Sequence, residues 1–164
     1  MGKFSGTLIA SDFDGTLVTS AKELPGNVRE AIQYYMENGG LFTVCTGRTH
    51  QGFPFKYPDF VNAPVLLSNG GMAFDYGKNE VVFCDGIGDE GLPVMRDIRD
   101  FFPKVAIEMY PYGATYAIHL NDKSERHFTS QGIPFEVIDD PADAPRPWAK
   151  AMIGGEREDI AGIQ

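Results

Sequence analysis

Two short apolar runs separated by one amphipathic segment constrain the fold of this chain more than any other feature. The runs are TLIAS at residues 7–11 and LFTVC at residues 41–45, and both have the composition of buried strands in a parallel sheet. Between them, PGNVREAIQYYMENGG at residues 25–40 places apolar side chains at helical spacing, begins with proline and ends with two glycines. Strand, helix and strand in this order predict a right-handed βαβ crossover between parallel strands.

Further strands extend this first region. PVLLS at residues 64–68 is a third apolar run, which follows a loop rich in proline and aromatic residues at 51–60. MAFDYGKNEVVFC at residues 72–84 predicts a hairpin that turns at Gly77 and Lys78. We therefore expect residues 1–84 to form an α/β region around a Rossmann-like parallel sheet.

The pattern changes near residues 86–91, so residues 85–164 predict a second region. Its expected elements are a helix at 90–102, strands at 105–110 and 115–120, a helix at 122–130, strands at 135–139 and 149–155, and a helical start at 156–164. This order is αββ followed by αββ, which is typical of a small antiparallel α+β layer.

Composition excludes several classes of partner. The 164 residues carry a formal net charge of −9, whereas nucleic acids and anionic membrane surfaces both require a basic patch. No segment approaches the run of about 18 apolar residues that spans a membrane, and the first residues lack the long apolar region of a signal peptide. Cys45 and Cys84 lack the paired spacing of a zinc or redox site. We expect a cytoplasmic protein whose oligomeric state the sequence leaves open.

Two aspartates follow the first predicted strand directly, in DFDGT at residues 12–16. Open α/β sheets bind ligands at the carboxyl ends of their strands, and alternation along an extended backbone points Asp12 and Asp14 the same way. Two close carboxylates repel each other unless a cation lies between them, and Mg²⁺ is a hard ion that binds carboxylates, water and phosphate oxygens. The structural alternative is that both aspartates only stabilise an Asp-Gly turn.

Polar residues also follow the second and third strands, in VCTGR at 44–48 and LLSNGG at 66–71. Thr46 and Gly47 are candidates for holding a phosphate, or alternatively for a helix N-cap and a turn. Arg48 offers a planar cationic fork for phosphate, with a surface ion pair as an equal alternative. Asn69 either stabilises its own turn or reaches a substrate.

Together these strings resemble the motifs of the haloacid dehalogenase (HAD) superfamily of phosphohydrolases. DFDGT resembles the first motif, VCTGR resembles the second, and LLSNGG with the following hairpin resembles the segment that leads into an inserted cap. The combination is similar to the Cof-type subfamily, whose members are mostly cytoplasmic phosphatases of sugar phosphates and small metabolites. The resemblance implies an α/β fold with the amino-terminal half of a HAD core at residues 1–84 and an α+β cap at residues 85–164.

The resemblance also implies a chemistry for the two aspartates. Asp12 would attack the phosphate and form an aspartyl-phosphate, a reaction that divides hydrolysis into two displacements. Asp14 would act first as general acid for the leaving alcohol and then as general base for water. The Asp12 carboxylate and the Asp14 backbone carbonyl would bind Mg²⁺.

By the same resemblance, the Thr46 hydroxyl and the Gly47 N–H would bind phosphate oxygens, and Arg48 and Asn69 are further candidate contacts to phosphate or substrate. The implied function is a Mg²⁺-dependent phosphatase of small phosphorylated metabolites. The particular substrate is not readable, because the loops of the cap carry no specificity motif.

Two HAD motifs that should follow the cap have no match, namely a lysine and an acidic GDxxND segment. Lys150 lies within the expected cap, and GGERED at 154–159 lacks the acidic pattern. We therefore expect either a truncated chain, which an end within the predicted helix at 156–164 favours, or a naturally short protein that binds without turnover. In both cases we expect little phosphatase activity, weak Mg²⁺ binding and an exposed sheet edge that favours association. The alternative function is a non-catalytic phosphate-binding or interaction module. A phospho-accepting receiver domain is disfavoured, since no acceptor aspartate ends a later strand.

Overall fold

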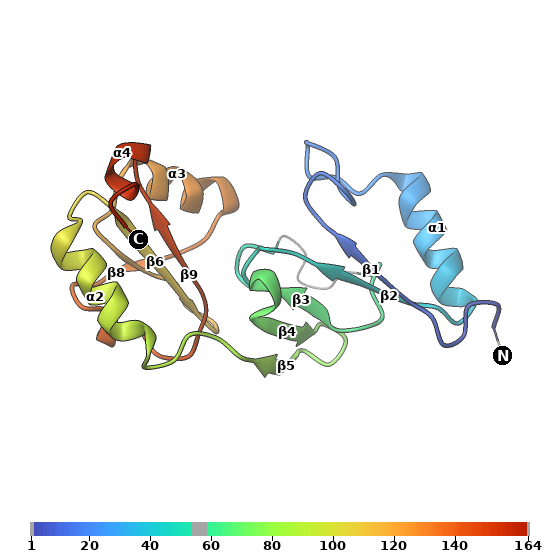
Figure 1. Cartoon of the computed structure of the whole chain (residues 1–164). Coiled ribbons are helices and arrows are strands. Elements are labelled where there is room, and N and C mark those ends of the chain that lie inside the picture. Colours follow the sequence, from blue (N-terminus) through green and yellow to red (C-terminus); the bar gives the residue numbers. More distant parts are fainter. Residues whose placement is uncertain (1, 54–58, 164) are drawn as a thin grey trace. The chain divides into compact units, whose positions relative to one another are not determined.

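The structure is a computed structural model that describes residues 2–53 and 59–163 and separates into two compact units (Figure 1). Unit 1 contains the described residues of 2–48 and 59–83, and unit 2 contains residues 49–53 and 84–163. The loop expected at 51–60 lies partly outside the described residues. No helix within the described ranges is long and apolar enough to cross a membrane.

Unit 1 is built on a five-stranded sheet in the order β1-β2-β3-β4-β5. The strands are β1 (Leu8–Asp12), β2 (Leu41–Cys45), β3 (Val65–Leu67), β4 (Met72–Asp75) and β5 (Glu80–Cys84). The first three strands run parallel, and β4 is antiparallel to β3. Because α1 (Gly26–Glu37) connects β1 to β2, the predicted βαβ unit is confirmed.

Helix α1 packs against the rest of unit 1 through its buried residues, Ile32 and Tyr35. The Tyr35 hydroxyl lies 2.7 Å from Thr7 Oγ1, so the helix is tied to the residue that precedes β1. Gly40 completes the fit, since a Cβ at this position would lie 2.3 Å from the Tyr35 ring. The glycine that ends the helix therefore lets the chain pass under the aromatic ring into β2.

Strand β1 lies at one end of the described sheet, and the prediction that it is buried is wrong. Leu8 is 57% exposed and Ile9 is 46% exposed. The physical reason is position: a buried strand of a parallel sheet needs a neighbour on each side, whereas β1 pairs with β2 alone among the described residues. Its apolar composition is therefore not matched by burial in this chain.

Unit 2 is built on a four-stranded sheet in the order β8-β7-β6-β9. Its elements are α2 (Gly91–Phe101), β6 (Ala106–Pro111), β7 (Tyr116–Ile118), α3 (Asp122–Gln131), β8 (Glu136–Val137), β9 (Trp148–Gly154) and α4 (Arg157–Ile160). The expected αββαββ order is confirmed, but the fully antiparallel arrangement is wrong. Strand β8 pairs parallel with β7 because α3 forms the crossover that a parallel connection needs.

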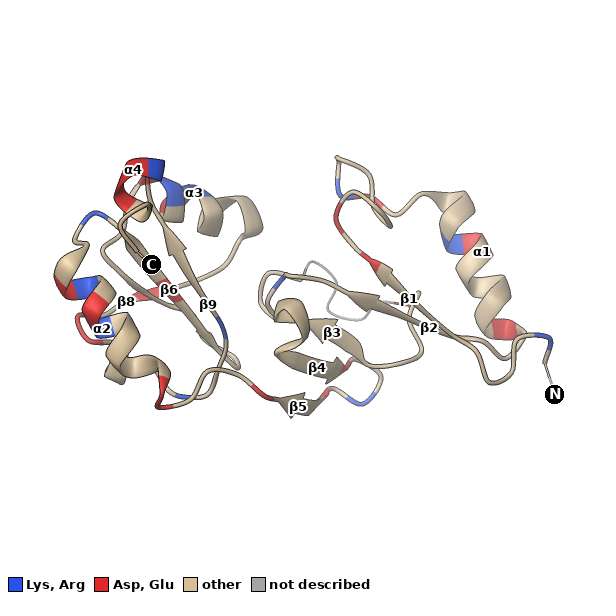
Figure 2. Ribbon diagram, in the orientation of Figure 1, with Lys and Arg blue, Asp and Glu red and all other residues tan. Residues whose placement is uncertain are grey.

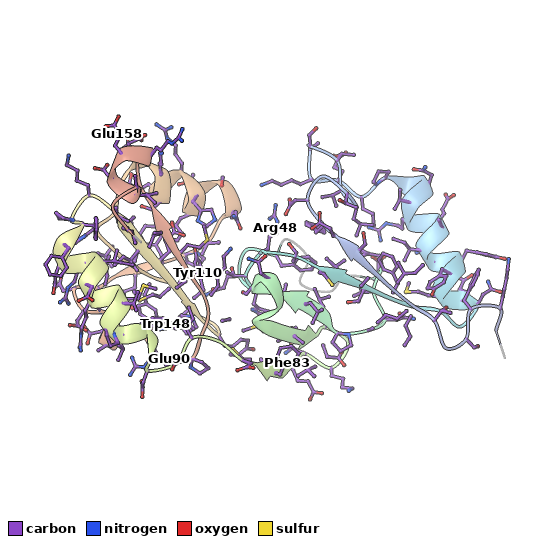
Figure 3. All side chains as sticks on the ribbon, in the orientation of Figure 1. Arg48, Phe83, Glu90, Tyr110, Trp148 and Glu158 are labelled. Carbon is purple, nitrogen blue, oxygen red and sulfur yellow. The ribbon has the colours of Figure 1, made fainter. Side chains whose placement is uncertain are left out.

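Successive side chains of β6 point to opposite faces of the sheet, so they join two separate hydrophobic clusters in unit 2. Ile107 and Met109 join Trp148 in a cluster that also receives α2, whereas Tyr110 joins Phe128 of α3 in a second cluster. Trp148 and Tyr110 are labelled among the side chains of Figure 3. The two helices thus cover the two faces of this sheet.

Candidate active site

The carboxyl ends of β1, β2 and β3 surround a pocket of about 360 Å³ within unit 1. Its lining residues are Asp12, Cys45, Thr46, Gly47, Leu66, Asn69 and Gly70. Since β1 and β2 run parallel with Asp12 opposite Cys45, the residues that follow the two strands emerge at the same edge of the sheet. The pocket brings together four predicted site residues, Asp12, Thr46, Gly47 and Asn69, from three strand ends.

Asp12 is the last residue of β1, and its side chain is exposed at the pocket. The Thr16 hydroxyl donates to Asp12 Oδ2 over 3.0 Å. The turn between them depends on Gly15, whose φ of +75° suits glycine. Phe13 is fully buried and anchors the same turn to the core. The result is a carboxylate that is oriented by one hydrogen bond and accessible to a ligand.

Asp14 lies in a different place from the one predicted. Strand β1 ends at Asp12, so the alternation that would have pointed Asp14 into the pocket does not continue. The Asp14 carboxylate instead meets Arg48, with Nε–Oδ2 and Nη2–Oδ1 distances of 2.7 and 2.8 Å. The acidic residues at this turn are visible after β1 in Figure 2. Neither Asp14 nor Arg48 lines the described pocket.

The ion pair with Arg48 changes the pKa of Asp14. Hydrogen bonds from Arg48 hold the pKa of the Asp14 carboxyl below its ordinary value, and this effect exceeds the opposing effect of burial. The charges of Arg48 and Lys22 add to the same direction. Asp14 is therefore ionised at neutral pH in this geometry.

Thr46 is buried and held by three hydrogen bonds. Its N–H donates to Leu66 O, its carbonyl accepts from Asn69 N, and its Oγ1 accepts from Arg48 N, at 2.9, 3.1 and 3.2 Å. Because Oγ1 accepts this hydrogen bond, the hydroxyl proton is available for donation to another acceptor. No helix begins at Thr46, so the N-cap alternative does not apply.

Gly47 is closely covered by Asn69. A Cβ at position 47 would lie 2.7 Å from Asn69 Oδ1, so a larger residue would displace the amide. Asn69 in turn belongs to a turn in which Ser68, Asn69 and Gly70 all have positive φ, at 55°, 57° and 95°. Among the described residues the buried Ser68 Oγ has no hydrogen-bond partner. Backbone strain of this kind is often found at functional sites.

Sequence reasoning did not assign Cys45, Leu66 or Gly70 to the pocket. The strand register was the missing signal, because Cys45 pairs with both Asp12 and Leu66. Burial, followed by the charge of Asp12, raises the pKa of the Cys45 thiol. Cys45 is therefore a neutral wall of the pocket and not a thiolate nucleophile.

The donor atoms at the pocket are compatible with a hard cation that keeps most of its water. Residues 2–53 and 59–163 contain no group of three or more His, Cys, Asp or Glu side chains that could hold a metal ion. The Asp12 carboxylate is accessible, whereas the Asp14 carboxylate is bound by Arg48. An accessible carboxylate is one of the few protein ligands that Mg²⁺ often takes beside water and phosphate, so Asp12 fits this ion.

Comparison with known proteins identifies the family of this chain. The family model of haloacid dehalogenase-like hydrolases matches residues 9–164. A phosphatase of Bacillus subtilis, 5-amino-6-(5-phospho-D-ribitylamino)uracil phosphatase YwtE, is 39% identical over 70 residues, which cover 42% of this chain and 24% of the relative. The pyridoxal phosphate phosphatase YbhA of Escherichia coli is 31% identical over 93 residues, which cover 56% of this chain and 32% of the relative.

Solved structures agree with the fold. A haloacid dehalogenase-like hydrolase from Bacteroides thetaiotaomicron superposes with a TM-score of 0.79 at 21% identity, and covers 96% of this chain and 61% of its own. The subclass IIB sugar phosphatase BT4131 gives a TM-score of 0.76 at 16% identity, over 96% of this chain and 63% of its own. The chain thus spans under two thirds of these structures and about a third or less of the two curated relatives.

Proposed function

Because this chain belongs to the haloacid dehalogenase-like hydrolases, we propose that the pocket at the end of β1 is the phosphate subsite of a phosphatase that acts on small phosphorylated metabolites with Mg²⁺. One observation carries the proposal: the accessible Asp12 carboxylate shares a pocket with Thr46 and Gly47, which come from the neighbouring parallel strand. The proposal includes a cytoplasmic location.

In the first proposed step, the phosphate occupies the pocket and Asp12 attacks phosphorus. A bond forms between an Asp12 carboxylate oxygen and phosphorus, the bond to the leaving alcohol breaks, and Asp14 in its protonated form gives the alcohol its proton. The Thr46 hydroxyl stabilises the charge on the phosphoryl oxygens. Thr16 orients the attacking carboxylate through its hydrogen bond to Oδ2.

In the second proposed step, water attacks the aspartyl-phosphate, the bond between Asp12 and phosphorus breaks, and a proton of the water passes to Asp14. The contact with Arg48 keeps Asp14 ionised, which favours this basic role. The acidic role in the first step requires Asp14 to be protonated, and therefore to loosen its contact with Arg48. Mg²⁺, held by the Asp12 carboxylate and the Asp14 carbonyl, would supply neutralising charge beside the phosphate.

The test is a phosphatase screen against sugar phosphates, pyridoxal phosphate and nucleotides, with and without Mg²⁺. Named relatives are a sugar phosphatase and a pyridoxal phosphate phosphatase, which guides the panel. In keeping with the expectation of little activity, we expect any hydrolysis of these compounds to be weak, to depend on Mg²⁺ and to be lost in Asp12→Asn. Asp97→Asn changes an exposed carboxyl on α2 in the same way and should retain activity. Equal activity in Asp12→Asn and the unaltered protein would contradict the proposal.

A non-catalytic phosphate-binding module is the second candidate, favoured by the placement of Asp14 on Arg48 outside the pocket. The same screen separates the two functions when inorganic phosphate binding is also measured. Binding that depends on Thr46, together with no hydrolysis of any compound, would support the binding module.

A further inference from the structure

Arg48 is fixed beside the phosphate pocket without lining it. Its guanidinium meets both oxygens of Asp14, at 2.7 and 2.8 Å, in a planar bidentate contact. The guanidinium carbon also lies 5.5 Å from the ring centroid of Phe13, which is fully buried. Arg48 comes shortly after β2, which ends at Cys45, and its side chain is labelled in Figure 3.

The two members of the ion pair differ in exposure. The Arg48 side chain is 9% exposed, whereas the Asp14 side chain is 50% exposed. A mostly buried guanidinium is restrained by its surroundings, and a half-exposed carboxylate has room to move. Arg48 is therefore the anchor of the pair, and Asp14 is the part that can turn toward a ligand.

The backbone of Arg48 is also held by hydrogen bonds. Its N–H donates to Thr46 Oγ1 over 3.2 Å, and its carbonyl accepts from Ser68 N over 2.8 Å. Ser68 opens the turn of three residues with positive φ. Because a residue with a Cβ has few allowed conformations at positive φ, this turn presents the Ser68 N–H in one direction.

We propose that Arg48 is a positioning residue that holds Asp14 beside the pocket, with the Ser68–Gly70 turn fixing its backbone, and that Arg48 is not a phosphate ligand. The inference rests on the proposed function of the pocket. It differs from the expectation that Arg48 contacts phosphate, because Arg48 directs Nε and Nη2 to the Asp14 carboxylate and does not line the described pocket. Thr46, Gly47 and Asn69 remain the contacts of the phosphate itself.

The first experiment measures inorganic phosphate binding to the full chain by the amide resonances of Thr46 and Gly47. The double variant Asp14→Asn with Arg48→Gln removes one negative and one positive charge, so the formal net charge is unchanged. We expect its Kd for phosphate to stay within about twofold of the unaltered protein. Thr46→Val, which removes a hydrogen bond to a charged group, should weaken binding about tenfold or more.

A second readout follows the Nε–H resonance of Arg48. We expect Asp14→Asn to shift this resonance, and Asp75→Asn, a carboxyl in unit 1 that is bound by Lys78, to leave it unchanged. Phosphate should shift the amide resonance of Thr46, and it should shift the Nε–H resonance of Arg48 little. Arg48→Lys, which keeps the charge without the planar fork, should lower kcat and leave KM within about twofold wherever hydrolysis is measurable.

The outcomes separate the inference from the function on which it rests. The positioning role would be overturned by a tenfold higher Kd for phosphate in the double variant, or by an Arg48 Nε–H resonance that does not shift in Asp14→Asn. Neither result would contradict the phosphate site itself. No phosphate-induced shift at Thr46 in the unaltered protein would instead overturn the proposed function of the pocket, and with it the role of Arg48 there.

Discussion

At the scale of single residues, the pocket depends on how closely two loops approach each other. Asn69 donates its N–H to the Thr46 carbonyl and covers Gly47 with its amide. The motif strings predicted Asp12, Thr46, Gly47 and Asn69 as site residues, and parallel strand ends bring all four to one pocket. An ion pair was one of the two alternatives for Arg48, but its partner, Asp14, was not predictable, since the pairing depends on the turn that ends the alternation of β1.

Gly47→Ala tests this close approach. The added methyl group would lie 2.7 Å from Asn69 Oδ1, and the amide must move to accommodate it. We expect inorganic phosphate affinity to fall several-fold, with a change in unfolding free energy of about 1 kcal/mol or less, because only the end of a side chain is displaced. Isothermal titration calorimetry measures the affinity.

Gly26→Ala is the matched control, because a Cβ there meets nothing within 4 Å. It should leave phosphate affinity unchanged. Equal affinity in Gly47→Ala and the unaltered protein would show that the Gly47 and Asn69 contact does not shape the subsite.

At the scale of elements, polar contacts as well as apolar cores attach the helices of unit 2 to its sheet. On the side of α3, buried Glu108 of β6 accepts from the Tyr110 hydroxyl and lies 2.8 Å from His127 Nδ1. His127 Nε2 lies 2.7 Å from Gln131 Nε2. Apolar spacing predicted both helices and the sheet strands, but it carries no information about such a buried polar network, which depends on the register of β6 under α3.

Glu108→Ala should destabilise unit 2 strongly. Tyr110 and His127 would lose a shared buried acceptor, and an unsatisfied buried group costs about 1–3 kcal/mol. Glu108→Gln keeps one acceptor oxygen and should cost less. Urea unfolding followed by circular dichroism measures both, and an equal loss in the two variants would contradict the role of the acceptor.

On the side of α2, Asp140 accepts from Arg96 and Arg99 of the helix and from Ala142 N. Hydrogen bonds from Arg96, followed by those from Ala142 and Arg99, hold the pKa of Asp140 below its ordinary value. A pKa that is lower in the folded state adds stability above the ordinary aspartate range, and this stability is lost as pH falls through the folded-state pKa.

Asp140→Asn should therefore lower the thermal midpoint at pH 7, and the difference from the unaltered protein should shrink as the pH falls below about 4. Asp97→Asn on the exposed part of α2 is the control for charge alone. A difference at pH 7 that persists unchanged at pH 2 would show that Asp140 acts through packing and not through its charge.

At the scale of the whole molecule, the chain contains two units with separate sheets and separate cores. The βαβ order predicted the parallel part of unit 1, because local spacing and loop length determine it. The exposure of β1 was not predictable from the same pattern, since an apolar run looks alike whether or not a neighbour covers it. The parallel pairing of β8 likewise depends on the path of the chain after α3.

The open edge of β1 predicts self-association of this chain, since Leu8 and Ile9 are exposed on a strand that pairs on one side among the described residues. Sedimentation velocity over a range of concentrations should show a species larger than the monomer. Ile9→Lys should shift the population toward the monomer. Val94→Lys, at an exposed position of α2, should leave it unchanged, and a monomer at every concentration would contradict the prediction.

The burial of Trp148 has an optical consequence. It is the only tryptophan of the chain, it is fully buried, and it lies in the core of unit 2. Its fluorescence therefore reports on unit 2 alone, while the tyrosine and phenylalanine bands of circular dichroism report on both units. The unfolding of unit 2 can therefore be followed in the intact chain without a label.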